Sequence, residues 1–365
     1  MKGQADVIDT GGVAPIIELS GDGRTRGQMH GEQVRSLIAS SLERWRDRIE
    51  QINGRSSADH VARFLGASGL IDAVRRDSPD LYDEVLGIAE ASGQPVDDMF
   101  AYNFMDEEWR YSGTSAIGCS VVGIEGESGV LLGQNMDLPA SMDGSQVLLH
   151  IRGDADPEQF VASAAGMIGV LGVNRDGVAC CVNTLAQLPS ALEGMPVAFI
   201  VREVLRRRTR TEAGAYLRSV KHASGQHYAI ADRHGIDAYE CSSVGIAARP
   251  ISNPQLVHTN HPLWTPGSAE LTAKPDELEL SGTRSRYNYL SVAVPQIRDA
   301  VELESVFASR DSGVCVTPRP PRLSKTFCGA LFEIGEDETR ARFALGQPGA
   351  VEWIGAPWTA PAIVT

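Results

Sequence analysis

Residues 113–138, GTSAIGCSVVGIEGESGVLLGQNMDL, hold the pattern that decides the fold. An apolar run at 120–124 and a second at 130–132 flank a turn that contains glycine. Two strand-like runs joined by a short turn are typical of a β-hairpin. Such a hairpin brings Cys119, at the start of the first strand, to the same end as Asp137, which closes the second.

This end of the hairpin carries groups that suit acyl-transfer chemistry. Cys119 supplies a thiol, which forms covalent acyl intermediates when a nearby group activates it. Asp137 and Asn135 are two residues apart and therefore lie on the same face of the second strand. We take Cys119 as the candidate nucleophile and the other two side chains as candidate partners.

The peptide bond between Gly118 and Cys119 is a candidate cleavage site. Glycine adopts backbone angles closed to other residues, which suits a strained turn in which a thiol attacks its own preceding carbonyl. An N-to-S acyl shift followed by hydrolysis would make Cys119 a new N-terminus. Its α-amine, with a pKa of about 7.7–8, would then be a general base for its own thiol.

The order and spacing of the motifs resemble a known family. The pair Gly118–Cys119 is followed eighteen residues after the cysteine by Asp137 of GQNMD, and much later by HTNH at 258–261. This pattern resembles the acyl-coenzyme A:6-aminopenicillanic acid acyltransferase family of self-cleaving N-terminal-nucleophile (Ntn) hydrolases. Choloylglycine hydrolases and penicillin V acylases are more distantly similar.

The resemblance extends from about residue 18 to residue 353. It implies a zymogen activated by autocatalytic cleavage into an N-terminal chain, 1–118, and a C-terminal chain, 119–365, which together form one Ntn-hydrolase domain. The first chain would be mostly helical, and the second would begin with the nucleophile.

The same resemblance implies roles for the candidate site residues. Asp137 matches the aspartate that lies near the α-amine of the nucleophile, where a carboxylate tunes proton affinity. Asn260 of HTNH matches the family's oxyanion-hole asparagine, which donates an N–H to the developing negative charge. Asn183 of CVNTL resembles the amide with this role in the choloylglycine relatives.

Three supporting residues complete this set. Ser242 aligns with a serine that the penicillin acyltransferases need for self-cleavage, although Ser243 follows it instead of proline. Arg284 matches the arginine of a Ser-Arg pair near the family's site, with Thr283 in place of the serine. His258 is expected to pack against the pocket or to orient Asn260.

The hydrophobic pattern predicts an α+β fold with a mainly helical N-terminal segment. Helices are expected at 20–52, 58–74, 79–91, 95–108, 196–208, 211–221, 283–293 and 299–309. Strands are expected at 14–19, 117–124, 129–135, 146–151, 159–164, 167–173, 178–184, 226–232, 235–241, 256–259, 326–334 and 341–345. Alternating strand blocks and helix pairs fit a four-layer αββα sandwich, with two sheets face to face and helices outside.

Composition restricts the partners and the location. The net charge of −14 argues against nucleic acid or an anionic membrane as a partner. Apolar runs stay shorter than the roughly 18 residues that span a bilayer, and the N-terminal sequence lacks the apolar region of a secretory signal. We therefore expect a cytoplasmic protein.

We expect neither a metal nor a cofactor. The six cysteines lack CxxC spacing and indicate neither a zinc site nor a disulfide framework. His258 and His261 stand three apart, but no third ligand accompanies them, and strand geometry would direct them to opposite faces.

The sequence thus favours an amidohydrolase that cleaves a small N-acylated amine or amino acid through a thioester on Cys119. An acyl-CoA-dependent N-acyltransferase is the first alternative. A homologue that is not cleaved and only binds is the second. A papain-like protease is the third, and it requires His258 within hydrogen-bond reach of the thiol. The two cleaved chains would stay associated, and a higher oligomer remains open.

Overall fold

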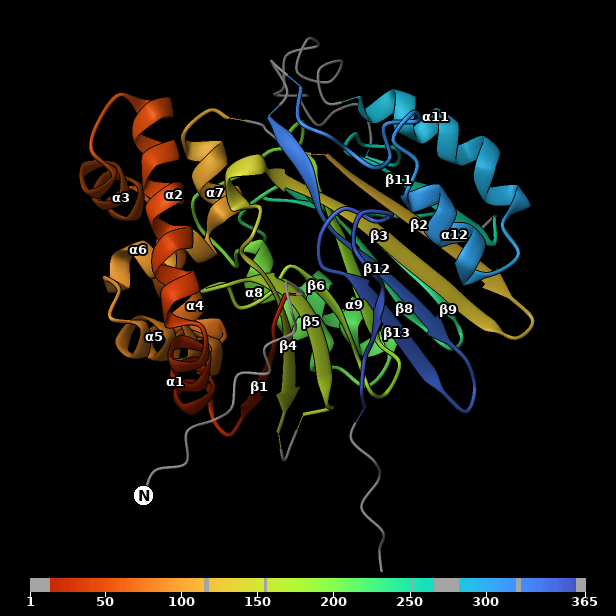
Figure 1. Ribbon diagram of the computed structural model, residues 1–365, viewed down its shortest axis with the longest axis horizontal. Coiled ribbons are helices and arrows are strands. Elements are labelled where there is room, and N and C mark those ends of the chain that lie inside the picture. The colour runs from red at the N-terminus through yellow and green to blue at the C-terminus, as the bar shows by residue number, and fades with distance from the viewer. Residues whose placement is uncertain are drawn as a thin grey trace, which may run out of the picture.

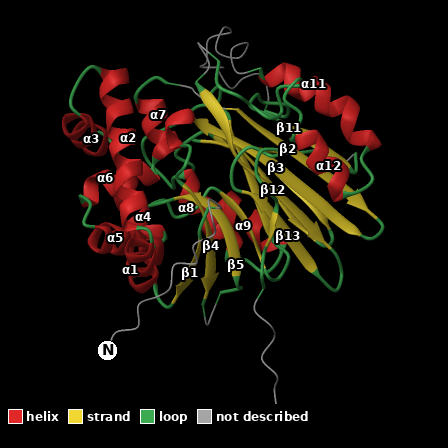
Figure 2. Ribbon diagram, in the orientation of Figure 1, coloured by secondary structure: helices red, strands yellow, loops and turns green. Residues whose placement is uncertain are grey.

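The structure is a computed structural model that describes residues 14–114, 118–153, 156–250, 253–265, 282–319 and 323–358. Two β-sheets pack face to face beside a block of N-terminal helices (Figure 1). Figure 2 shows the helices on the outer faces of the two sheets. The predicted α+β class and four-layer αββα sandwich are confirmed.

The helices have the following bounds: α1 (Gly23–Gln33), α2 (Arg35–Asn53), α3 (Ser57–Gly66), α4 (Leu70–Asp77), α5 (Pro79–Ser92), α6 (Val96–Asn103), α7 (Met105–Tyr111), α8 (Val197–Leu205), α9 (Arg210–Ser219), α11 (Thr283–Ala293) and α12 (Ala300–Phe307). The described helices include none that is long and apolar enough to cross a membrane.

One sheet has eight strands in the order β1-β4-β5-β6-β7-β8-β9-β10, and the other has six in the order β11-β2-β3-β12-β13-β14. The strand bounds are β1 (Ile16–Ser20), β2 (Gly118–Gly126), β3 (Gly129–Pro139), β4 (Gln146–Arg152), β5 (Gln159–Ala164), β6 (Leu171–Asn174), β7 (Ala179–Thr184), β8 (Gln226–Asp232), β9 (Gly235–Ser242), β10 (Gly245–Ala248), β11 (Gln255–His258), β12 (Ser324–Ile334), β13 (Thr339–Ala344) and β14 (Ile354–Gly355). Helices α8 and α9 contact the larger sheet, and α11 and α12 contact the smaller one.

The side chain of Gln134 joins the two sheets close to the site. From β3 it donates to the Val182 carbonyl on β7 at 2.5 Å and accepts from the Val182 N–H at 2.9 Å. A buried amide that satisfies both atoms of one backbone unit fixes the separation and register of the two sheets, since leaving either partner unmet is costly.

Three expected helices are each divided in two. The helix expected at 20–52 is interrupted at Val34, whose φ of −127° and ψ of 32° leave the helical region. The pattern at 58–74 breaks before Gly69, and the pattern at 95–108 breaks at Phe104. The strand expected at 167–173 begins only at Leu171, and the short strands β10 and β14 were not predicted.

Helix α1 packs unusually close to α5 because its contact face consists of glycines. Gly23, Gly27 and Gly31 are spaced by four residues and share one helix face. A Cβ at Gly27 would lie 2.0 Å from the Glu84 carbonyl oxygen. A side chain here would therefore push the two helices apart, and it would also disturb the charged groups that lie between them.

Those charged groups are buried and paired. Glu84 on α5 accepts from Arg26 on α1 at 2.8 Å and from Arg202 on α8 at 2.7 Å. Burial alone would raise the pKa of Glu84, but the two arginines lower it to about 2. Helices α1 and α5 of the N-terminal block and α8 of the sandwich thus meet at one carboxylate, which anchors the helical block to the sandwich.

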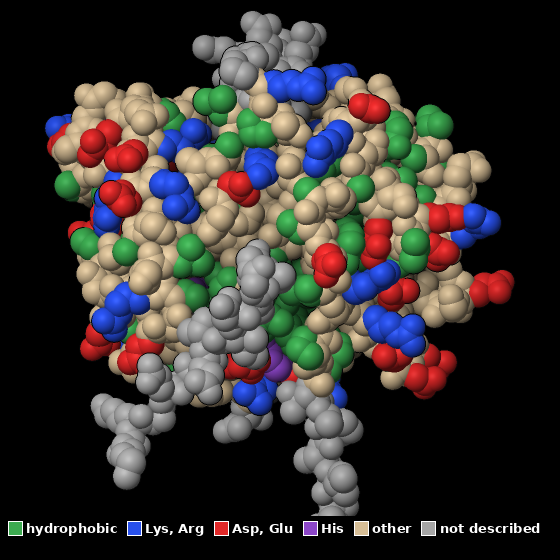
Figure 3. All heavy atoms as spheres, viewed as in Figure 1, with side chains coloured by type: hydrophobic (Ala, Val, Ile, Leu, Met, Phe, Trp, Pro, Cys, Tyr) green, Lys and Arg blue, Asp and Glu red, His purple; other side chains and the backbone are tan. Residues whose placement is uncertain are grey.

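The surface seen in Figure 3 carries Lys and Arg side chains interspersed with Asp and Glu. The excess of acidic residues is therefore not gathered into a single patch on this face, and basic side chains do not form a stripe on it.

Glu84→Gln should destabilise the protein by about 3–5 kcal/mol, because it leaves the charge of Arg202 buried without its counter-ion. It also removes one of the two acidic partners of Arg26, which keeps Asp80. The free energy of unfolding in denaturant measures the loss. Glu90→Gln breaks an exposed pair with Arg24 and serves as the control, with little change expected. Equal effects of the two substitutions would contradict this role for Glu84.

Candidate active site

The hairpin of β2 and β3 places Cys119, the candidate nucleophile, at the same end as Asp137. Cys119 pairs with Met136, and Gly118 pairs with Asp137, in a continuous antiparallel register. Cys119 is 1% exposed, and its sulfur lies 3.3 Å from the sulfur of Met136. Cys119 thus lies at the start of β2 in the smaller sheet, and its thiol faces the interior.

Three side chains from different elements converge on the main chain of Cys119. Its N–H donates to Asn260 Oδ1 at 2.7 Å. Its carbonyl accepts from Asn183 Nδ2 at 3.4 Å and from a guanidinium N–H of Arg286. Arg286 also donates to Asn260 Oδ1 at 2.9 Å, so the groups on the two sides of Cys119 are linked.

The arginine in this cluster is not the one expected. Arg284 is exposed, whereas Arg286 is 1% exposed and reaches Cys119. Both residues are in α11, whose first residue is Thr283. Residues three apart share a helix face, so Thr283 and Arg286 face the site together, and Arg284 turns to solvent. The expectation for Arg284 was therefore wrong by two residues.

Asn260 is held rigidly through all of its polar groups. Its N–H donates to Thr283 Oγ1 at 2.8 Å, and its carbonyl accepts from Gln187 at 3.0 Å. Its side-chain Nδ2 donates to the Thr184 carbonyl at 3.1 Å. In the uncleaved chain, Asn260 therefore presents its oxygen to Cys119, and its amide nitrogen is engaged elsewhere.

Asn183 is the penultimate residue of β7 and contacts two histidines. Its Nδ2 also donates to the His258 carbonyl at 3.2 Å, and its Oδ1 lies 3.2 Å from His227 Nδ1. The imidazole rings of His227 and His258 stack with centroids 3.6 Å apart. Burial is the main reason why the pKa of His227 lies well below its usual value, so this ring is neutral.

The ring of His258 faces Glu240, not the thiol. Its Nε2 lies 3.2 Å from Glu240 Oε1, and its Nδ1 lies 2.7 Å from the Thr259 carbonyl oxygen. Both ring nitrogens therefore have partners other than Cys119, which is unfavourable to a papain-like Cys-His pair. Within the described part of the chain, no group of three or more His, Cys, Asp or Glu side chains could hold a metal ion.

Asp137 is fully buried next to the candidate cleavage site. Its Oδ1 accepts from Thr326 Oγ1 at 2.6 Å. After the effect of burial, its negative charge is the second cause of the raised pKa of the Cys119 thiol, which is about 12. The thiol is therefore protonated at neutral pH in the uncleaved chain and needs a base before it can attack.

Two expected supporting residues have other contacts. Asn135 donates from Nδ2 to the Phe307 carbonyl at 2.8 Å and to the Val314 carbonyl at 3.0 Å, and so anchors the end of α12. Ser242 Oγ donates to the Gly245 carbonyl at 3.1 Å, closing the turn between β9 and β10. These bonds give both residues structural roles, whereas the sequence suggested support for the site.

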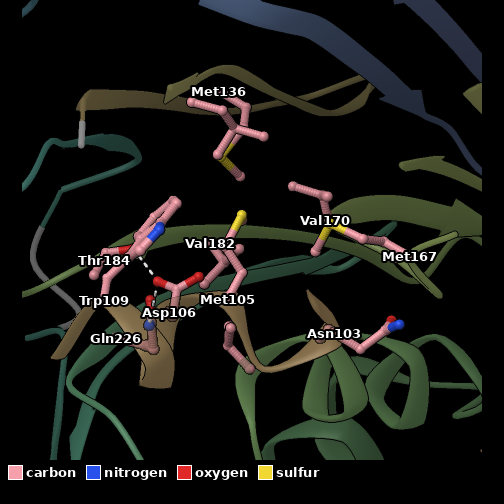
Figure 4. Close-up of a pocket in the computed structure, with 14 residues that line it drawn as sticks. Asn103, Met105, Asp106, Trp109, Met136, Met167, Val170, Val182, Thr184 and Gln226 are labelled. Carbon is pink, nitrogen blue, oxygen red and sulfur yellow. Dashed lines mark hydrogen bonds between the residues drawn. The ribbon is translucent and has the colours of Figure 1, made fainter. Parts of the chain in front are cut away.

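A cavity of about 30 Å³ lies beside Met136 (Figure 4). Met136, whose sulfur touches Cys119, lines it. Most of the other lining side chains are apolar, among them Met105, Trp109, Met167, Val170 and Val182. The polar side chains in the lining are those of Asn103, Asp106, Thr184 and Gln226. The sequence analysis did not include Asp106 among the site residues.

Comparison with known proteins assigns the family. The family model described as acyl-coenzyme A:6-aminopenicillanic acid acyl-transferase matches residues 124–350, more than half of the chain. The chain belongs to this family. A relative from Emericella nidulans, the acyl-coenzyme A:6-aminopenicillanic-acid-acyltransferase 40 kDa form, is 26% identical over 331 residues, which are 88% of this chain and 90% of that protein.

Two solved structures are also similar to this chain. Penicillin V acylase from Agrobacterium tumefaciens has a TM-score of 0.36 and 18% identity, over 62% of this chain and 82% of that one. A conjugated bile acid hydrolase from Clostridium perfringens has a TM-score of 0.44 and 13% identity, over 68% of this chain and 100% of that one. Membership of the family indicates an enzyme of the acyltransferase class.

Glu107→Gln should make stability less dependent on pH. Burial, and then the charge of Asp106, raise the pKa of Glu107 to about 8. The folded state therefore keeps a proton that the unfolded chain releases near its ordinary value of 4.5, and wild-type stability falls as pH rises between these values, by at most about 1.4 kcal/mol per pH unit.

Thermal unfolding at pH 5 and pH 8.5 tests this expectation. The Glu107→Gln variant should unfold close to the wild type at pH 5 and at a higher temperature than the wild type at pH 8.5. An equal difference at the two pH values would mean that Glu107 is ionised in the folded state.

Proposed function

We propose that this chain is an autoproteolytically activated Ntn amidohydrolase, with Cys119 as the N-terminal nucleophile of the mature protein. The observation that carries the proposal is the convergence of Asn183, Asn260 and Arg286 on the main chain of one buried cysteine that follows glycine. A structural cysteine needs no such set of donors and acceptors around its backbone.

The first step is the cleavage of the chain before Cys119. The thiol attacks the carbonyl carbon of Gly118, the C–N bond breaks, and the thiol proton passes to the leaving nitrogen. Water then hydrolyses the thioester to give the Gly118 carboxylate and the free thiol. Arg286 and Asn183 hold the Cys119 carbonyl during this step, so that the new N-terminus stays in place.

The second step is the attack on substrate. The α-amine takes the thiol proton and the thiolate attacks the amide carbonyl of a small N-acylated amine or amino acid, while Asn183 and Asn260 donate to the oxyanion. Asn260 must exchange its bond to Thr184 for this purpose. The α-ammonium then protonates the leaving amine, Asp137 stabilises that charge, and water hydrolyses the acyl thioester on Cys119.

Acyl transfer to an amine, with acyl-CoA as donor, is the alternative outcome of the same intermediate. The Emericella nidulans relative is named as such a transferase. Both reactions pass through an acyl thioester on Cys119. They differ in the donor that forms it, an amide that releases an amine or an acyl-CoA that releases the CoA thiol, and in the acceptor, water or an amine.

The same proposal includes the chains and the location of the mature protein. The N-terminal chain, 1–118, stays bound to the C-terminal chain, 119–365, because Phe104 of the first and Phe199 of the second belong to one buried core. We propose a cytoplasmic enzyme that uses small-molecule substrates, with neither nucleic acid nor membrane as a partner.

Purified protein should give two fragments that separate between Gly118 and Cys119, and Cys119→Ala should give one intact chain without turnover. Intact-mass spectrometry and N-terminal sequencing measure this. Cys241→Ala, which alters a buried cysteine on β9, is the matched control and should still be cleaved. Full turnover by Cys119→Ala would refute the proposed mechanism.

Asn183→Ala should lower kcat of the cleaved enzyme by about 10²–10³-fold with a smaller change in KM, because it removes an oxyanion donor. Steady-state kinetics on an N-acyl amino acid panel, normalised to the cleaved fraction, gives the ratio. Asn135→Ala is the control, since this buried asparagine binds α12 instead of the site. The idea fails if both variants lower kcat equally.

A further inference from the structure

The carboxyl group of Asp106 is only half satisfied by the protein. Its Oδ1 accepts from Thr184 Oγ1 at 2.5 Å and from Gln226 Nε2 at 3.0 Å. For its Oδ2, the described residues supply no hydrogen-bond partner. Figure 4 shows this second oxygen turned towards the cavity, on the side of Val182.

The surroundings make this free oxygen a specific feature. Asp106 is 8% exposed, and the side chains across the cavity from it, such as Met136 and Val170, are apolar. Burying a polar group without a hydrogen bond is costly. A buried carboxyl group with one oxygen directed into an apolar cavity is therefore suited to a ligand that supplies the missing donor.

The neighbouring acid also has one buried oxygen without a hydrogen-bond partner among the described residues, Glu107 Oε2, but this residue does not line the cavity. Glu107 turns away from the cavity, and its Oε1 accepts from Ser224 Oγ at 2.6 Å and from the Val197 N–H at 3.3 Å. Glu107 is absent from the cavity lining. Of these two adjacent buried carboxyl groups, only that of Asp106 lines the cavity.

The position of the cavity indicates which part of a substrate would occupy it. Met136 lies between the cavity and the sulfur of Cys119. In a thioester only the acyl group remains bonded to this sulfur, so a chain that passes Met136 belongs to the acyl group. The cavity holds about 30 Å³, and its Met105, Met136 and Met167 side chains are of the flexible type that adjusts to a ligand.

We propose that this cavity is the acyl-binding pocket and that Asp106 selects acyl groups with an apolar chain and a terminal hydrogen-bond donor, above all a primary ammonium. The inference rests on the proposed function, because it uses the thioester on Cys119. An ammonium supplies the donor that Oδ2 lacks and also offsets the cost of a buried carboxylate. In agreement with this cost, burial raises the pKa of Asp106 above its usual value.

The test compares straight-chain acyl p-nitroanilides in matched pairs. In each pair one acid ends in a methyl group, and the other ends in an ammonium at the same position. For the best chain length, cleaved wild-type enzyme should have a kcat/KM about 10- to 100-fold higher for the amino member, the range expected of one hydrogen bond to a charged group.

Asp106→Asn should reverse this preference by lowering kcat/KM for the amino member, with little change for the methyl member. Glu107→Gln is the matched control and should keep the wild-type ratio. The inference is overturned if wild-type enzyme favours the methyl member at every length, or if Asp106→Asn leaves the ratio unchanged. The wild-type comparison decides even if Asp106→Asn does not fold.

Failure of the proposed function would look different. Protein that is not cleaved at Gly118–Cys119, or cleaved protein that turns over neither member of any pair, would refute the amidohydrolase itself. Cleaved protein that turns over the methyl members alone would refute only the role of Asp106.

Discussion

The site depends on the hydrogen bonds that fix the main-chain N–H and carbonyl of Cys119. Asn260 binds the N–H of Cys119, and Arg286 and Asn183 bind its carbonyl. A buried guanidinium is expensive to desolvate, and Arg286 offsets that cost by donating to the Cys119 carbonyl, to Ser120 Oγ and to Asn260 Oδ1. The position of the thiol is thus fixed by groups that act on its backbone.

The cavity beside Met136 depends in turn on the packing of the N-terminal helices. Helix α7 leads from the N-terminal helices towards the cysteine and contributes Asp106 and Trp109 to the cavity. Within the helical block, α1 and α5 approach each other closely over glycines. The block is fixed to the sandwich by the ion pair of Glu84 with Arg202. The N-terminal segment is therefore part of the cavity wall, and its loss would open the cavity.

The sequence predicted the parts of this arrangement that depend on local spacing. The hairpin, and the placement of Cys119 opposite the end of β3, follow from two apolar runs and a glycine turn. Asn260 and Asn183 were found through motifs, and the structure brings both to Cys119. Their catalytic roles, and the cleavage at Gly118, remain predictions.

Other parts depend on contacts that spacing does not encode. Arg284 and Arg286 are the same residue type in the same helix. Only the rotation of the helix set by Thr283 decides that Arg286 faces the site and Arg284 faces solvent. In the sequence, Asp106 resembles an ordinary polar residue at a helix end. Its contacts arise only in the fold, where β7 and β8 bring Thr184 and Gln226 against it. The break at Val34 has a similar origin, because the glycine face of α1 must turn to α5. Tertiary packing decides each of these cases.

Burial favours the neutral form of several groups at the site. Burial raises the pKa of Cys119 to about 12, raises that of Asp106, and lowers that of His227. An α-amine created at Cys119 would enter the same environment, where burial lowers the pKa of an amine and so favours its neutral, basic form. The apolar surroundings that keep the thiol protonated in the uncleaved chain would thus prepare the new terminus to accept its proton, and Asp137 would then stabilise the ammonium that results.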